Sequence, residues 1–139
     1  MRKLSEIVSH QAPLTVPSNA TVCEACRRMR DCNTGSILVI DDNGKLVGIF
    51  TGRDAVQRVL AIGKSPSRTR IGAVMTPDPV TAMPGQSAVE ALHLMWNGGF
   101  SHVPVVDGDK ILGLVSQTDI VGDEEERHGY EREMWEHLR

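Results

Sequence analysis

Residues 48–56 read Gly-Ile-Phe-Thr-Gly-Arg-Asp-Ala-Val, and residues 113–121 repeat the pattern as Gly-Leu-Val-Ser-Gln-Thr-Asp-Ile-Val. In each copy a glycine precedes two apolar residues, a hydroxyl residue (Thr51 or Ser116) and, three positions later, an aspartate. The apolar residues are expected to close a strand, and the hydroxyl residue to cap the helix that follows. Two such copies 65 residues apart indicate a duplicated unit.

The hydroxyl and the aspartate of each copy are candidate ligand groups. A helix that starts at a strand end is expected to leave backbone N–H groups free, and these can bind a phosphate. Asp54 and Asp119 lie in the first helical turn, where the helix dipole favours a carboxylate. A carboxylate there can accept two hydrogen bonds from a vicinal diol such as a ribose. The alternative is that both aspartates only stabilise the helix starts.

Composition limits the class of protein. A chain of 139 residues suits one domain or two half-domains that share a core. A net charge of -3 does not favour nucleic-acid binding. Neither a signal peptide nor a membrane span is expected, so the sequence predicts a soluble cytoplasmic protein. Cys23 and Cys26 align with apolar Val89 and Leu92 of the second copy, which favours buried cysteines over a metal or redox site.

The duplication extends over most of the chain. Residues 13–16 match 79–82 at an offset of 66, and the offset falls to 65 after a shortened turn. The predicted organisation is a first repeat at 1–62, a linker at 63–70, a second repeat at 71–122 and a C-terminal helical tail at 123–139. Arg68 or Arg70 of the linker is either solvated or reaches a bound phosphate.

Each repeat is predicted to form a short strand, a helix, a strand, a hairpin turn, a strand and a helix. Capping boxes starting at Thr21 and Ser87 mark the first helix of each repeat. Short apolar runs predict the strands at 14–16, 37–40, 46–50, 80–82, 103–106 and 111–115. The fold class is therefore α/β (α+β), with two pseudo-symmetric βαββα repeats packed through their sheets and a C-terminal tail.

With these motifs in order, the sequence resembles a tandem pair of CBS domains, the module named after cystathionine β-synthase. The resemblance implies two clefts between the repeats that hold an adenosine-containing ligand such as AMP, ADP, ATP or S-adenosylmethionine, and no obligatory cofactor. It also implies that two pairs associate, here as a homodimer.

The resemblance assigns roles to the duplicated motif. It implies that Asp54 and Asp119 bind the ribose hydroxyls and that Thr51 and Ser116 lie near the α-phosphate. Arg53 precedes its aspartate as in the family's commoner form, whereas Thr118 stands at that position in the second copy.

The resemblance also implies an adenine pocket that reads the purine through main-chain groups. Its expected lining residues are Leu14, Thr15, Ile37, Val39, Val80, Thr81, Val103, Pro104 and Val105. His102 stands where relatives often have arginine, and histidine is mostly uncharged above about pH 6.5, which disfavours polyphosphates.

The sequence predicts a non-catalytic sensor that binds an adenosine-containing ligand and passes its occupancy to a partner protein. The alternative is a structural dimerisation or interaction module without a ligand. An enzyme ranks third because no nucleophile motif or acid–base pair stands out. In the tail, the apolar residues Tyr130, Met134, Trp135 and Leu138 are expected to form one stripe, which packs on the chain's own domain or on a partner subunit.

Overall fold

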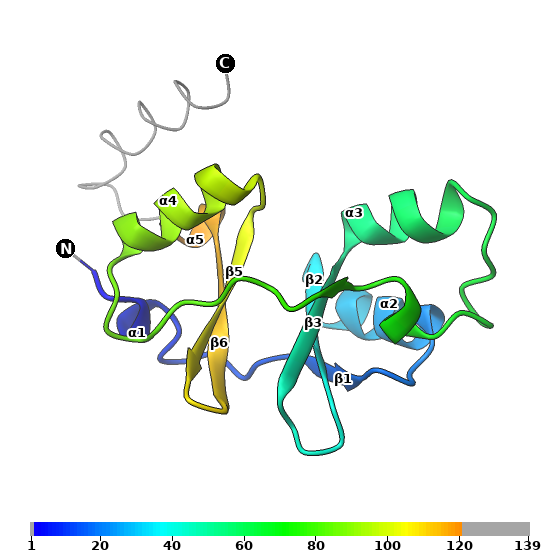
Figure 1. Ribbon diagram of the computed structural model, residues 1–139, viewed down its shortest axis with the longest axis horizontal. Helices are drawn as coiled ribbons and strands as arrows, with labels where there is room; N and C mark the ends of the chain where they lie inside the picture. The colour runs from blue at the N-terminus through cyan, green and yellow to red at the C-terminus, as the bar shows by residue number, and fades with distance from the viewer. Residues whose placement is uncertain (1, 121–139) are drawn as a thin grey trace. The chain divides into compact units, whose positions relative to one another are not determined.

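The computed structural model describes residues 2–120 and divides the chain into two compact units (Figure 1). One unit is Pro13–Pro79. The other combines the described residues up to Ala12 with those from Val80 onward. Both units contain strands and helices, so the predicted α+β fold class is confirmed. Within the described part of the chain, no helix has the length and apolar character needed to cross a bilayer.

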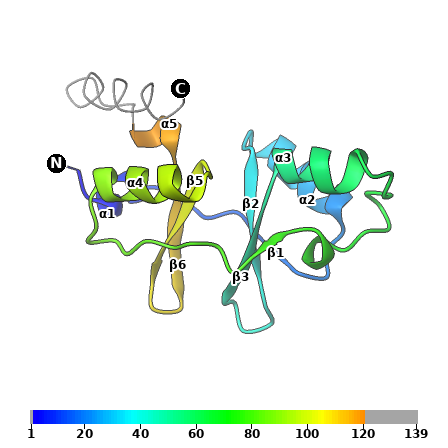
Figure 2. The ribbon, with the colours of Figure 1, turned by 45° about the horizontal axis from the view of Figure 1, so that its top comes forward.

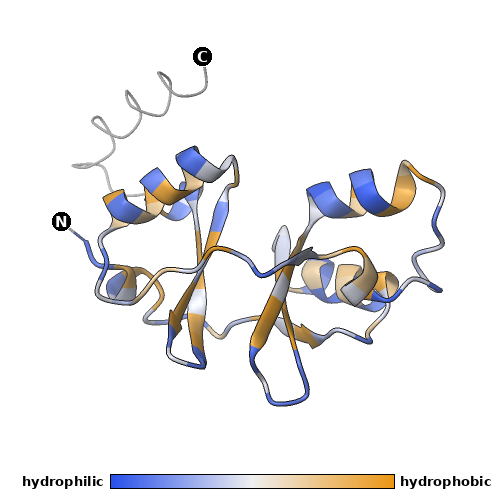
Figure 3. Ribbon diagram, in the orientation of Figure 1, coloured by the Kyte–Doolittle hydropathy of each residue, from blue (hydrophilic) through white to orange (hydrophobic). Residues whose placement is uncertain are grey.

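The Pro13–Pro79 unit is built on a sheet of four strands in the order β1, β2, β3, β4. Strand β1 (Thr15–Pro17) runs parallel to β2 (Ser36–Ile40), and β2, β3 (Leu46–Thr51) and β4 (Thr76–Pro77) are antiparallel neighbours. Figure 3 shows β3 largely hydrophobic and its hairpin turn with β2 hydrophilic, which matches the local sequence pattern.

Two helical segments complete this unit. Helix α2 (Val22–Asp31) follows β1, and α3 (Gly52–Ala55) follows β3 and continues as the π-helical turn η1 (Val56–Leu60). Figure 2 shows α2 and α3 close to each other near the start of β2, whose first residue pairs with Thr51, the residue before α3. The core of the unit is formed by fully buried residues of the sheet and of both helical segments, among them Ala25, Ile37, Val39, Phe50 and Val59.

The second unit has the same elements in a reduced form. The antiparallel pair β5 (His102–Asp107) and β6 (Lys110–Ser116) forms its sheet, with α4 (Ala88–Gly98) before it and α5 (Gln117–Ile120) after it. The strand predicted at 80–82 is wrong: only Ala82 pairs, through a parallel bridge to Val105. Val80 is 46% exposed, so it lacks the burial that favours a valine in a strand.

The helix starts follow the predicted caps. Thr21 Oγ1 accepts the N–H of Glu24 at 3.1 Å, and Ser87 Oγ accepts the N–H of Glu90 at 3.1 Å. Each bond satisfies an N–H that has no partner inside the helix. Gly99 ends α4 in the left-handed conformation at φ 72°, which glycine adopts without strain.

The leading segment of each sequence repeat docks on the other repeat. Helix α1 (Leu4–Ile7) belongs to the unit of α4 and β6, and the 3₁₀ turn η2 (Ile71–Ala73) with β4 belongs to the unit of α2 and β3. The docking bonds correspond: Leu4 N donates to Gln86 O at 2.9 Å, and Ile71 N donates to Ala20 O at 2.8 Å. Leu4 and Ile71 are both fully buried, so each leading segment supplies a core residue. The compact units therefore differ from the consecutive repeats of the sequence.

The linker at 63–70 is largely exposed, and backbone hydrogen bonds hold it against the start of α2. Pro66 O and Thr69 O accept the N–H groups of Cys23 and Val22, at 3.0 and 2.9 Å, at the start of α2. Arg70 Nη1 donates to Asn19 O at 2.7 Å. The linker thus completes the N-terminal cap of α2, and Arg70 has a backbone partner where the sequence suggested a free cation.

Candidate functional site

The duplicated hydroxyl and aspartate form a reciprocal capping box in the Pro13–Pro79 unit. Thr51 ends β3 and caps α3: its Oγ1 accepts the N–H of Asp54 at 3.2 Å, while its own N–H donates to Asp54 Oδ2 at 3.0 Å. The second carboxylate oxygen, Oδ1, lies 3.7 Å from Nε of Arg58 one turn along the helix. Only 14% of the Asp54 side chain is exposed. Asp54 is therefore held on both oxygens.

The copy in the other unit is held on one oxygen. Ser116 N donates to Asp119 Oδ2 at 2.8 Å, and Ser116 Oγ donates to the same oxygen at 3.0 Å. Thr118 Oγ1 lies 2.8 Å from Ser116 Oγ. Within residues 2–120, Oδ1 of Asp119 has no hydrogen-bond or ion-pair partner, and the residue is exposed. An ionised carboxylate can accept about four hydrogen bonds, so Asp119 keeps capacity for a ligand.

These contacts correct the expectation of free N–H groups at the two helix starts. Gly52 N donates to Gly35 O at 2.9 Å, and Gln117 N donates to Ser101 O at 3.2 Å. Asp54 N and Asp119 N donate to their capping hydroxyls. Two of the first three N–H groups are thus already paired in each copy, which weakens the case for a phosphate bound there.

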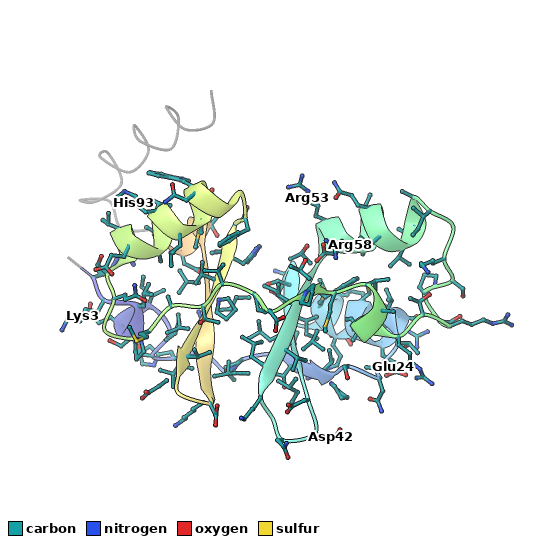
Figure 4. The ribbon with its side chains drawn as sticks, viewed as in Figure 1. Lys3, Glu24, Asp42, Arg53, Arg58 and His93 are labelled. Atoms are coloured by element: carbon teal, nitrogen blue, oxygen red, sulfur yellow. The ribbon has the colours of Figure 1, made fainter. Side chains whose placement is uncertain are left out.

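Sequence reasoning missed Arg58. Its guanidinium connects Asp54 to the docked leading segment, because Nη1 donates to Met75 O at 3.0 Å. Figure 4 shows Arg58 on the side of α3 that faces this segment, and Arg53 extending away from the start of the helix. Arg53 has no hydrogen-bond or ion-pair partner among the described residues, so it is available to an anion. The spacing of Asp54 and Arg58, four residues in a helix, is the signal that could have found this pair.

His102 lies beside the second capping box. It pairs with Ser116 across β5 and β6, and its side chain is partly buried. Burial lowers the pKa of His102 below 6.5, and the nearby carboxylate of Asp119 partly opposes this shift. Ser36 pairs with Thr51 at the equivalent place in the other unit and is 3% exposed. The 66-residue offset between the repeats aligns Ser36 with His102, so the sequence alone could have identified Ser36 as the counterpart of His102.

The predicted lining residues divide by unit. Thr15 pairs with Leu38 between parallel strands, and Leu38 N donates to Leu14 O at 3.0 Å, which brings the 14–15 and 37–39 segments side by side. In the other unit, Ala82 N donates to Pro104 O at 2.9 Å, next to Thr81. The side chains of four of these residues are fully buried in the cores and offer only backbone to a ligand: Ile37, Val39, Val103 and Val105.

No group of three or more His, Cys, Asp or Glu side chains suited to a metal lies in the described part of the chain. Cys23 and Cys26 are partly buried on α2, and Cys32 is exposed. Trp96 packs against the buried cluster of its own unit, with its ring 5.6 Å from that of His93.

Comparison with known proteins places these features in a family. The sequence profile of the CBS domain matches residues 4–61 and again residues 71–124. The chain belongs to the CBS domain family. Each of the two CBS matches contains one copy of the duplicated motif, so the capping residues Thr51 and Ser116 occupy equivalent positions in two CBS domains.

Several relatives are similar over most of this CBS pair. The chain is 37% identical to the CBS domain-containing protein CBSCBSPB3 of Arabidopsis thaliana over 110 residues, which are 79% of this chain but only 20% of that protein. It is 41% identical to the uncharacterized protein YlbB of Bacillus subtilis over 100 residues, which are 71% of this chain and 67% of YlbB. The chain spans about a fifth of the plant relatives it matches.

A solved CBS pair shows a similar fold. The CBS domain pair of protein MJ0100, crystallised in complex with 5-methylthioadenosine and S-adenosyl-L-methionine, is 30% identical with a TM-score of 0.79. The match covers 87% of this chain and 94% of the MJ0100 chain.

Proposed function

We propose that this CBS pair is a non-catalytic regulatory module that binds an adenosine-containing ligand, such as AMP, ADP, ATP or S-adenosylmethionine, and signals its occupancy through a conformational change. The observation that carries the proposal is the hydroxyl–carboxylate capping box, which occurs once in each CBS domain. The ligands of the MJ0100 pair, both adenosine derivatives, support the ligand class.

Asp119 is the better ribose acceptor of the two aspartates. Its capping bonds to Ser116 hold the carboxylate in place through Oδ2, and Oδ1 keeps its acceptor capacity. Asp54 must share Oδ1 with Arg58. A hydrogen bond to a charged acceptor contributes about 1.5–3 kcal/mol, so the loss of the Asp119 carboxylate should weaken binding by about tenfold to 150-fold.

The neutral His102 fits a ligand of low negative charge. Its lowered pKa removes a cation that would otherwise face a polyphosphate beside Asp119. AMP and S-adenosylmethionine should therefore bind this half of the pair more tightly than ATP does. Arg53 has no counterpart in the second copy, so any preference for phosphate should depend on the half that contains Asp54.

Isothermal titration calorimetry of the full chain with AMP, ATP, S-adenosylmethionine and NADH tests the proposal. We expect one of the adenosine ligands to bind, and Asp119→Ala to raise its Kd at least tenfold. Asp119→Asn separates the two roles of the residue, because the amide oxygen can still cap Ser116 but carries no charge. Asp42→Ala is the matched control, since Asp42 lies at the hairpin tip away from α3 (Figure 4). Equal Kd values for the Asp119→Ala and Asp42→Ala variants would refute the assignment of Asp119.

A ligand-free interaction module is the second candidate. The exposure of Val56 and Leu60, at 56% and 60%, favours a protein contact on η1. Homodimerisation is the expected form of such a contact. Size-exclusion chromatography with light scattering, combined with the titrations, separates the two functions: a stable dimer that binds none of the four adenosine-containing ligands supports the interaction module.

A further inference from the structure

The Pro13–Pro79 unit has a cavity that shares no residue with the proposed ligand site. It has a volume of about 380 Å³ and lies between α2 and the α3–η1 helical segment. Every residue that lines it belongs to these two segments or is Pro66 of the linker, so the cavity lies within one unit. Small-molecule sites usually have volumes of about 300–1,000 Å³. The cavity equals about a dozen water volumes, so an organic molecule of about ten to fifteen non-hydrogen atoms would fill it.

The floor of the cavity is apolar. Val22 lines it from α2 and Val59 from η1, and these side chains are only 1% and 0% exposed, so the packed core of the unit holds them in place. Cys23 and Cys26 lie beside them on α2. Burial raises the pKa of the Cys26 thiol, with a further contribution from Cys23, as expected for a wall of low polarity. An occupant should therefore have an apolar body.

Two arginines line the cavity on the α2 side. Arg27 has no hydrogen-bond or ion-pair partner within residues 2–120. Arg30 contacts Asp31 through Nε at 3.0 Å, but both side chains are more than 60% exposed, so this pair is weak. A guanidinium has five N–H donors, and Arg30 therefore keeps donors for a ligand. Among the described residues, no aspartate or glutamate lines the cavity, so an anionic group of a ligand would supply the missing counter-charge.

We propose that this cavity binds a small amphiphilic anion. Its apolar body, of about ten non-hydrogen atoms, rests on Val22 and Val59, and its carboxylate or phosphate accepts hydrogen bonds from Arg27 and Arg30. The body also covers Leu60, which lines the cavity and is 60% exposed. The tail predicted at 123–139, with its stripe of Tyr130, Met134, Trp135 and Leu138, lies outside the described residues, and the site needs none of it.

Titration calorimetry of the full chain tests the ligand class. Decanoate is the first probe, because its roughly twelve non-hydrogen atoms match the cavity. Decyl phosphate carries the other anionic head group, and 1-decanol and decyltrimethylammonium are the neutral and cationic controls of equal chain length. We expect at least one anion to bind tenfold more tightly than both controls, and the tighter of the two anions identifies the head group. Equal affinity for the anions and 1-decanol, or tighter binding of the cation, refutes the proposal.

Thiol alkylation locates the bound probe, because Cys23 and Cys26 line the cavity and Cys32 does not. Each cysteine is quantified by peptide mass spectrometry after timed exposure to N-ethylmaleimide. At saturating probe, we expect Cys26 to react at least fivefold more slowly relative to Cys32 than in the unliganded chain. An unchanged ratio with the probe bound shows that it binds elsewhere and overturns the assignment of the cavity.

Two sets of variants test the lining. Leu60→Glu places a carboxylate beside the expected anion and should raise the Kd of the probe at least tenfold, whereas Ile62→Glu, at a position 61% exposed and outside the lining, should not change it. Arg27→Gln combined with Arg30→Gln should raise the Kd at least fivefold, and Lys64→Gln, which also removes a cation from this unit, should not. All these positions are exposed, so the variants should fold, which circular dichroism checks. Equal Kd values within both sets refute the site.

A second copy of the chain is the competing occupant. It would protect Cys23 and Cys26 from alkylation without any probe, and this protection would increase with protein concentration. Light scattering at the same concentrations measures the dimer. Protection that requires the probe and is the same at every protein concentration supports the proposal. Protection that rises with dimer formation, and to which decanoate adds nothing, overturns it in favour of a protein contact.

Discussion

Gly113→Ala should destabilise the unit formed by the N-terminal segment and the second repeat. A Cβ at this position in β6 would lie 2.6 Å from Oε1 of Gln11 and 2.7 Å from Cβ of Val8. Distances below 3.0 Å essentially never occur for Cβ atoms, so the leading segment must move. Movement would break the two bonds that the Gln11 amide makes with Leu114, at 2.9 and 2.8 Å, and would uncover Val8, which is 4% exposed.

The expected loss of stability follows from these contacts. Overpacking of a closed site costs about 1–3 kcal/mol, and each lost hydrogen bond costs about 0.5–1.5 kcal/mol. The chain will take the less costly of the two responses, so we expect a loss of about 1–3 kcal/mol and a Tm lower by roughly 3–10 °C. Far-UV circular dichroism during urea and thermal unfolding measures both quantities.

Three comparisons make this prediction specific. Gly85→Ala is the control, because a Cβ there meets nothing within 4 Å, and its stability should stay within about 0.5 kcal/mol. Gly48→Ala, the equivalent change in the other unit, should cost less, because its Cβ would meet the flexible end of Met75. Val8→Ala combined with Gly113→Ala should lose less than the sum of the two single changes. A Gly113→Ala protein as stable as the Gly85→Ala control would refute the docking of residues 8–11 on β6.

Three further predictions address other contacts. Leu4→Ala should lower the free energy of unfolding by about 2–5 kcal/mol because Leu4 is fully buried. Ile62→Ala, at a position 61% exposed, should lower it by less than about 0.5 kcal/mol. Equal urea midpoints for the two variants would contradict the role of α1 in the core. Arg58→Ala should lower the free energy of unfolding by about 0.5–1 kcal/mol, since the side chain is 47% exposed. The same change frees Oδ1 of Asp54 and should therefore tighten ligand binding through Asp54, which titration calorimetry of the variant checks. Because folding lowers the pKa of His102, the unfolded chain binds more protons than the folded chain just below pH 6.5, so the free energy of unfolding should fall as the pH drops through that window. His102→Gln should remove the contribution of this residue to the pH dependence. Urea midpoints at pH 7.5 and 5.5, compared between the variant and the natural chain, measure the change.

The candidate site was partly predictable because its motif is local. The hydroxyl of Thr51 and the carboxylate of Asp54 are three residues apart, so a helix start brings them together whatever the rest of the chain does. Arg58 could be predicted by the same reasoning, but its second contact, to Met75 O, joins residues that no local rule connects. The difference between the two aspartates is therefore decided by the docked segment, because within residues 2–120 Asp54 has an arginine held in this way and Asp119 has none.

The sequence by itself determined the duplication, the caps at Thr21 and Ser87, the two hairpins and the CBS family, because each rests on repetition or on contacts within about four residues. Only the tertiary structure decided that α1 and η2 each complete the unit of the other repeat. Leu4 and Ile71 lie in short segments with no readable periodicity, and their burial depends on partners such as Gln86 and Ala20 that are 82 and 51 residues away. Such pairings depend on chain closure and on the fit of side chains in a packed core, which a local pattern does not encode.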